Sequence, residues 1–147
     1  MSFKYKFEKI MHVKEREKDE ALDIYNQATR RFEEAATKLY ELLKKKEDLD
    51  RLQSERLVSG LQVVEMRYQQ QFISNLEKTI SHYQKRVMNA RTQMYYYREK
   101  LAEKMTEYKK YEVIKDKKKM QYVSEMKRLE NIEMDDISIQ QFIHKEL

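Results

Sequence analysis

The chain of 147 residues has no cysteine, no proline and no tryptophan, and it contains a single glycine. Without cysteine it can form no disulfide bond and no thiolate metal site, which fits a reducing compartment. Without proline, and with one glycine, it has almost none of the residues that end helices and form tight turns. Because a compact fold of several elements needs several loops, these absences favour one long helical domain.

The residues that are present support the same interpretation. Charged residues make up 39% of the chain and hydrophobic residues 40%, a mixture typical of long helices and coiled coils. The first residues contain no apolar stretch long enough for a signal peptide or a membrane span. We therefore expect a soluble, cytoplasmic protein.

Gly60 marks the expected reversal of the chain, because glycine readily adopts the left-handed conformation that ends a helix. We predict a single domain over residues 1–147, with one helix over about 6–57, a turn over about 58–62, a second helix over about 63–134 and a tail over 135–147. The predicted fold class is all-α: an elongated antiparallel two-helix coiled-coil hairpin with an overhanging C-terminal helix.

Apolar residues recur at alternating spacings of three and four in both helical segments. In the first segment this seam comprises Phe7, Met11, Lys14, Lys18, Ala21, Tyr25, Ala28, Phe32, Ala35, Leu39, Leu42, Lys46 and Leu49. In the second it comprises Ile73, Leu76, Ile80, Tyr83, Val87, Ala90, Met94, Tyr97, Leu101, Lys104, Tyr108 and Tyr111. A stripe this long indicates a facing helix, since an isolated helix gains little from one.

The register of the hairpin follows from the position of Gly60. A reversal there pairs residues whose numbers sum to about 120 in an antiparallel coiled coil. Leu39 then lies near Ile80, and Lys14 lies near Lys104, so the apolar runs and the polar breaks coincide on the two helices.

The first helix begins near Phe7. The second helix therefore has a pairing partner only up to about residues 111–114. Beyond the lysine run at residues 115–119 the seam resumes with Tyr122, Met126, Leu129 and Ile132. An amphipathic helix that continues past its partner suggests a binding partner elsewhere, or self-association.

The sequence contains no recognisable catalytic arrangement. His12, His82 and His144 lie far apart and match no metal-ligand spacing, and there is no glycine-rich phosphate loop. A two-helix hairpin also lacks the concavity in which an active site is built. We expect no enzymatic activity, no metal and no cofactor.

Phe72 lies just beside the seam, on a flank of the helix that it shares with Leu76, Thr79 and Tyr83. It is either part of a partner-binding patch or a cap over the tip of the hairpin. Two further functions stay open on the residues alone. One is a scaffold that dimerises through Tyr95, Tyr96 and the overhang. The other is a nucleic-acid clamp that uses residues 59–112, where ten basic side chains exceed six acidic ones.

Three stretches resemble the FliJ family, the small coiled-coil components of the bacterial flagellar type III export apparatus. The first, residues 3–15, has an aromatic opening, then paired apolar residues and Lys-Glu. The second, residues 65–80, contains Gln-Gln-Phe-Ile followed by Leu-Glu and Ile. The third, residues 133–142, is similar to members from Firmicutes.

The resemblance implies a non-enzymatic protein with a hairpin similar to the central stalk of rotary ATP synthases. In such a protein the paired termini enter the ring of the flagellar export ATPase and promote its hexamer formation. The end near the turn contacts the cytoplasmic domain of the export-gate membrane protein, and export chaperones are also bound. Its place is the inner face of the cell membrane at the flagellar base, and nucleic acid is not a partner.

Carried over by position, the resemblance also implies two sets of binding residues. The gate-binding set is Phe72, Leu76, Thr79, Tyr83, Lys38, Leu42, Lys45 and Leu49. The ATPase-binding set is Phe7, Ile10, Met11, Lys14, Leu129, Ile132, Ile137 and Phe142. The sequence departs from the family pattern at Gln69, where relatives usually carry tyrosine, and at Lys45 and Leu49, where they also carry tyrosines.

Overall fold

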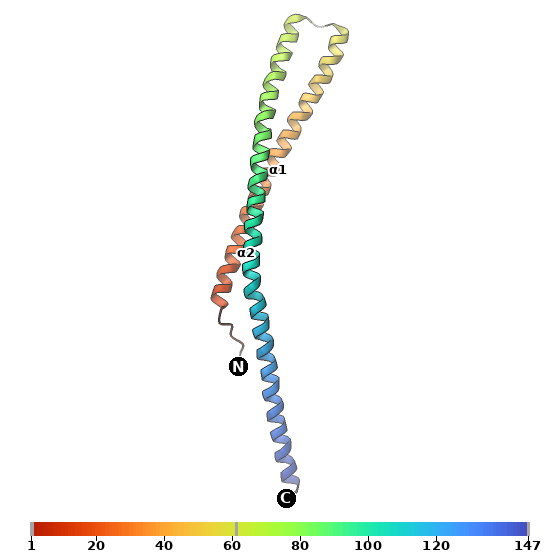
Figure 1. Ribbon diagram of the computed structural model, residues 1–147. Coiled ribbons are helices and arrows are strands. Elements are labelled where there is room, and N and C mark those ends of the chain that lie inside the picture. Colours follow the sequence, from red (N-terminus) through yellow and green to blue (C-terminus); the bar gives the residue numbers. More distant parts are fainter. Residues whose placement is uncertain (1, 61, 147) are drawn as a thin grey trace. The chain divides into compact units, whose positions relative to one another are not determined.

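The computed structural model describes residues 2–60 and 62–146, and these residues form two helices and no strand. Helix α1 spans Glu8–Ser59 and helix α2 spans Val63–Glu146 (Figure 1). Residues 135–146, which the sequence assigns to a tail, belong to α2, and no glycine or proline interrupts them. Leu147 of that tail lies outside the described residues.

The turn between the helices depends on Gly60, whose φ of 92° lies in the left-handed region. Helix α1 ends at the residue before it, as expected when a left-handed glycine follows the last helical residue. Leu61, part of the turn predicted over 58–62, lies outside the described residues.

Replacing Gly60 by alanine tests this conformation, because a Cβ placed there meets no heavy atom within 4 Å. The cost of Gly60→Ala therefore comes from the backbone alone, and we expect a loss of about 1–2 kcal/mol of unfolding free energy. Urea unfolding followed by circular dichroism measures it, with Val58→Ala on the exposed end of α1 as control. Gly60→Asn should cost less, since asparagine tolerates the left-handed region. Equal stability of the alanine variant would contradict the prediction.

The chain forms two compact units, one of Met1–Lys18 with Glu103–Leu147 and one of Asp19–Ala102. The single domain expected over residues 1–147 stays a prediction. In the Asp19–Ala102 unit the two helices are antiparallel, because Lys46 Nζ lies 3.5 Å from Glu77 Oε1 and Gln53 Nε2 lies 3.5 Å from Gln70 Oε1. The residue numbers of both pairs sum to 123, in agreement with the predicted register.

The core of the Asp19–Ala102 unit centres on Leu42, Leu76 and Ile80, which are buried. The side chains packed against this cluster are Leu39, Leu49 and Tyr83. Every seam position over residues 7–49 and 73–111 is buried or half-buried, whereas Leu129 and Ile132, where the seam was expected to resume, are exposed. The core is thin, since two helices can cover only one face of each other, and across both units only seven hydrophobic side chains of the described residues are buried.

Neither helix, over the residues the structure describes, contains a segment apolar and long enough to cross a membrane.

Candidate docking surfaces

The predicted gate-binding set divides into core and surface residues. Leu42 and Leu76 are buried in the core, and Leu49 and Tyr83 pack against it, so these four side chains hold the hairpin together. Phe72 is 48% exposed, and Lys45 Nζ lies 5.4 Å from the centre of its ring. The ring therefore keeps about half of its surface exposed beside this cation–π contact.

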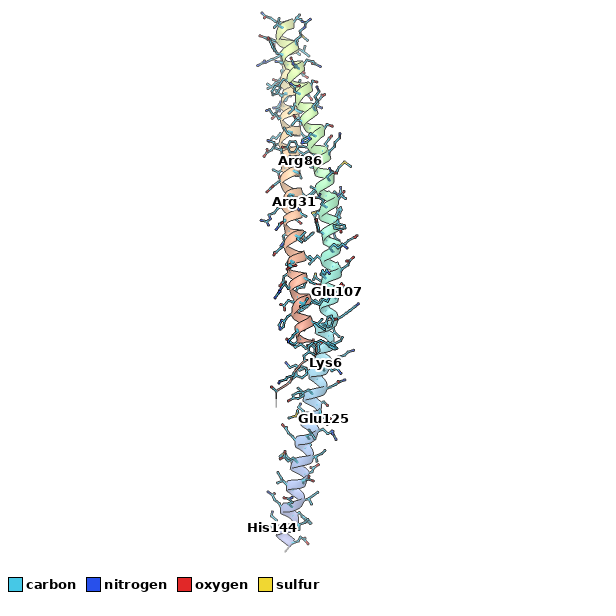
Figure 2. All side chains as sticks on the ribbon, turned by 90° about the vertical axis from the view of Figure 1, so that its left-hand side faces the viewer. Lys6, Arg31, Arg86, Glu107, Glu125 and His144 are labelled. Carbon is cyan, nitrogen blue, oxygen red and sulfur yellow. The ribbon has the colours of Figure 1, made fainter. Side chains whose placement is uncertain are left out.

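The other two members of the set lie on the surface of the same unit. Thr79 is exposed, and its hydroxyl donates to the Asn75 carbonyl oxygen at 3.1 Å, a bond inside its own helix. Lys38 lines a hollow with Tyr83, Arg31 and Arg86; Figure 2 shows Arg31 on α1 and Arg86 on α2. The structure thus places one basic side chain, Lys45, over the exposed ring of Phe72, and Lys38 in a separate hollow beside Tyr83.

A groove of about 460 Å³ lies closer to the turn than this set. Figure 1 shows α1 and α2 diverging towards the turn, and the groove lies between them. Its lining residues are Leu49, Leu52, Gln53 and Arg56 from α1 and Tyr68, Gln69, Phe72 and Ile73 from α2. It shares only Leu49 and Phe72 with the predicted set.

One polar atom in the lining of this groove lacks a partner. Gln69 Oε1 is buried and accepts no hydrogen bond from the described residues. Gln69 continues the seam of α2 by one step before Ile73, and Gln53 continues that of α1 after Leu49. These two glutamines are the signal in the sequence that the apolar seam ends here, and the groove residues could have been predicted from it.

In the other unit, the segment just before α1 carries three aromatic residues, Phe3, Tyr5 and Phe7, and we call this segment the aromatic strap. The Tyr5 hydroxyl donates to the Tyr111 carbonyl oxygen at 3.0 Å, and the rings of Phe3 and Tyr122 lie 5.6 Å apart. Phe7 meets the edge of Tyr111 at 6.2 Å. Burial, with Tyr111 and Glu8 nearby, raises the pKa of the Tyr5 hydroxyl. The expectation that pairing ends near residues 111–114 is therefore wrong, because the contacts of the strap continue along α2 to Tyr122.

The predicted contact of Lys14 with Lys104 takes the form of a charged cluster. Lys14 Nζ lies 3.2 Å from Glu107 Oε2 and 3.6 Å from Glu17 Oε2. Lys104 Nζ lies 3.4 Å from Glu17 Oε2 and 3.8 Å from Glu107 Oε2. Each lysine therefore faces two carboxylates, which offsets the repulsion between like charges (Glu107 is labelled in Figure 2).

The hydrogen bond from Lys14, with the charges of Lys104 and Lys14, holds the pKa of the Glu107 carboxyl below its ordinary value. A lowered pKa means that the charged cluster stabilises the fold above the ordinary carboxylate pKa and loses this effect as Glu107 is protonated. We expect the melting temperature to fall as the pH drops below about 4, and to fall less in Glu107→Gln. Thermal melts from pH 7 to 3 measure this, with Glu99→Gln as control. An unchanged slope in Glu107→Gln would contradict it.

The ATPase-binding set also divides into two parts. Met11 is buried, Phe7 and Lys14 are half-buried, and Ile10 is exposed on the outer side of α1. The remaining members, Leu129, Ile132, Ile137 and Phe142, are exposed on α2. Phe7, Met11 and Lys14 therefore serve the pairing of the helices, whereas Ile10 and the last four are available to a partner.

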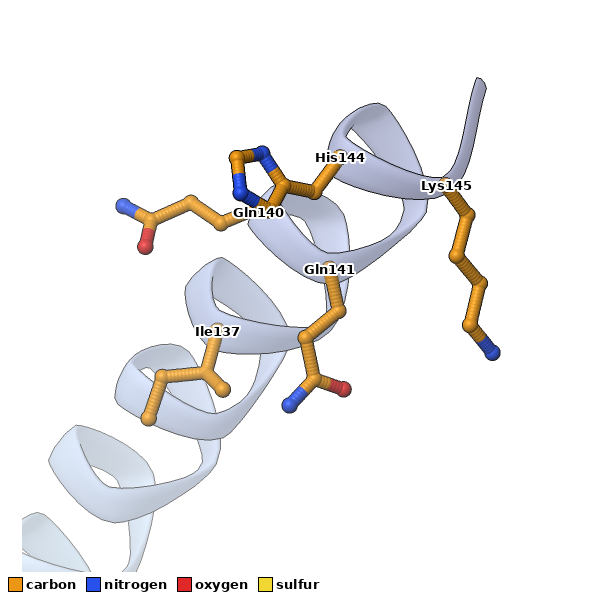
Figure 3. A pocket seen from close by; sticks show the side chains of 5 residues that line it. All are labelled: Ile137, Gln140, Gln141, His144 and Lys145. Carbon is orange, nitrogen blue, oxygen red and sulfur yellow. The ribbon is translucent and has the colours of Figure 1, made fainter. Parts of the chain in front are cut away.

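The end of α2 is a single exposed helix, which we call the overhang, residues 123–146. Every described residue from Lys127 onward is exposed. A hollow lined by Ile137, Gln140, Gln141, His144 and Lys145 follows this helix (Figure 3). All of its lining residues come from α2. The hollow is therefore an open surface on one helix and not a pocket enclosed by two.

The fold and these surfaces define a class of protein. The described residues include no group of three or more side chains placed to hold a metal ion. What they present is a paired helical hairpin with an apolar groove near its turn and an amphipathic overhang. The structure is that of a two-helix coiled-coil protein.

Comparison with known proteins identifies the family. A family model described as "Flagellar FliJ protein" matches residues 3–147. The chain is also 46% identical over 143 residues to the flagellar FliJ protein of Bacillus subtilis (strain 168), an alignment that covers 97% of each chain. The chain belongs to the FliJ family, the non-enzymatic coiled-coil proteins of flagellar export. No solved structure matched.

Proposed function

We propose that this flagellar export component acts as a stalk that couples the export ATPase to the export gate. One observation carries the proposal: α2 continues to Glu146 as an exposed helix with Leu129, Ile132, Ile137 and Phe142 on its surface. A helix that displays large apolar side chains to water is stabilised by a partner that covers them.

The partner proposed for the overhang is the ring of the flagellar export ATPase, whose hexamer formation it promotes. Ile10 and the four exposed overhang residues make the contact. Phe7, Met11 and Lys14 act indirectly, because they hold α1 and α2 together beside it.

The partner proposed for the surface near the turn is the cytoplasmic domain of the export-gate membrane protein. Phe72, Thr79, Lys38 and Lys45 offer exposed atoms for this contact. Leu42, Leu49, Leu76 and Tyr83 support it by fixing the backbone of both helices. The family resemblance adds export chaperones as partners and a cytoplasmic position, peripheral to the inner face of the membrane at the flagellar base.

Light scattering and turnover of the cognate flagellar ATPase, with and without the protein, test this function. Hexamer formation with raised turnover supports the stalk. Unchanged assembly and turnover at saturating protein would contradict it and favour a scaffold, for which the protein alone should oligomerise with increasing concentration.

A further inference from the structure

The groove near the turn has the composition of a binding site for one inserted side chain. Its apolar walls are only partly covered: Leu52 is 46% exposed and Tyr68 is 72% exposed. Its volume of about 460 Å³ falls within the range of sites that enclose small organic groups. Aromatic rings are suited to such walls, because they bury a large apolar area with little loss of rotational freedom.

Gln69 determines what kind of ring fits. Its Oε1 is buried without a donor, and buried polar atoms in native proteins almost always have one. The amide of Gln53, which also lines the groove, donates to Gln70 Oε1 and forms no hydrogen bond with Gln69. An aliphatic side chain in the groove would leave Gln69 Oε1 unsatisfied, whereas a ring that carries an O–H or N–H group could donate to it.

Arg56 determines what flanks the ring. It is the charged residue in the lining of the groove, and no ion pair or hydrogen bond of its guanidinium group is found within residues 2–60 and 62–146. A carboxylate next to the inserted ring would pair with it at the rim of the groove.

We propose that this groove receives a tyrosine or tryptophan side chain from an acidic segment of the partner, and that Gln69 Oε1 accepts its hydrogen bond. This inference rests on the proposed function in taking the gate domain as the partner. It goes beyond the gate-binding set by assigning specificity to Gln69, Arg56 and Leu52.

The chemistry of the groove can be tested on the full chain with p-cresol and toluene, which carry the same ring with and without the hydroxyl donor. Titrations followed by NMR of the Leu49 and Leu52 methyl groups should show p-cresol binding about three- to tenfold more tightly than toluene. In Gln69→Leu this difference should vanish, and in the exposed control Gln71→Leu it should remain. Equal affinities in the unmodified protein, or shifts confined to other residues, would overturn the inference.

Stability separates this role from a purely structural one. Gln69→Leu removes an unsatisfied acceptor and places an apolar side chain at a seam position, so its melting temperature should equal or exceed that of the unmodified protein. Reduced ligand affinity in a variant that is at least as stable cannot result from unfolding. A lower melting temperature with unchanged affinities would show that Gln69 serves only the fold.

Binding of the gate domain, measured by calorimetry, tests the partner. Gln69→Leu, Leu52→Ala and Arg56→Gln should each weaken it at least threefold, while Gln71→Leu should not. If Phe72→Ala weakens binding and the groove variants do not, the groove assignment is wrong and the proposed function stands. If the gate domain does not bind but p-cresol does, the gate partner is wrong and the chemistry of the groove stands.

Discussion

A chain that ends after Ser124 is expected to lose all stimulation and assembly of the export ATPase while it keeps a paired hairpin. The truncation removes the exposed part of α2, including Leu129, Ile132, Ile137 and Phe142. It keeps the ring contact of Phe3 with Tyr122 and the ion pair of Glu8 with Lys115. A cut at residue 115 would break both contacts, so the position of the cut decides whether assembly or folding is being tested.

Circular dichroism and light scattering should give opposite answers for this variant. Its melting temperature should stay near that of the full chain, because no buried side chain is lost. ATPase turnover should remain at the level of the ATPase alone. Within the full chain, Ile132→Glu should reproduce much of the loss, since it places a charge on the apolar stripe. Asn131→Glu adds the same charge at an exposed polar neighbour and should have little effect. Normal hexamer formation by the truncated chain would show that the overhang is not the ATPase contact.

The paired helices could be predicted from the sequence because their physics is periodic. A spacing of three and four residues fixes which side chains face the partner, and Gly60 alone fixes the register. Both predictions are confirmed over residues 7–49 and 73–111, where every seam position is buried or half-buried, and by pairs such as Lys46 with Glu77. The polar break could be predicted for the same reason, because the register places Lys14 beside Lys104. In the structure Glu107 pairs with Lys14 and Glu17 pairs with Lys104.

The strap could not be predicted in the same way. Phe3, Tyr5 and Phe7 are two residues apart, with a lysine between each pair and a glutamate after the last. A search for helical repeats does not detect this spacing of two. The strap lies along α2 because Tyr111 and Tyr122 offer rings and a carbonyl oxygen to it, and these contacts depend on the tertiary fold. The length of α2 was underestimated for a simpler reason. After residue 60 the chain contains no proline or glycine, and so no residue that would end this helix.

The groove near the turn is also a tertiary feature. Leu52 and Tyr68 each look like ordinary surface residues in the sequence, and they line one site only because α1 and α2 diverge there. The local cause of the divergence is visible in retrospect, since Gln53 and Gln69 replace the apolar residues that the repeat requires. A break in an otherwise strict repeat marks a place where the sequence satisfies a demand other than packing.

Leu76→Ala is expected to destabilise the hairpin by about 2–4 kcal/mol, because Leu76 is 7% exposed and packs with Leu42 and Ile80. So large a loss in a thin two-helix core should lower the melting temperature markedly. Phe72→Ala removes a half-exposed ring held on one face by Lys45, and should cost only about 1 kcal/mol. Urea unfolding followed by circular dichroism measures both variants.

The same pair of variants separates folding from gate binding, although their positions lie one helical turn apart. Phe72→Ala should weaken binding of the gate domain at least tenfold at a temperature where the variant is fully folded, as expected of an aromatic contact residue. Leu76→Ala should bind less tightly in proportion to the fraction unfolded, and cooling should restore its affinity. If cooling leaves Leu76→Ala as weak as Phe72→Ala, then Leu76 contacts the partner directly and the division of the set into core and surface residues is wrong.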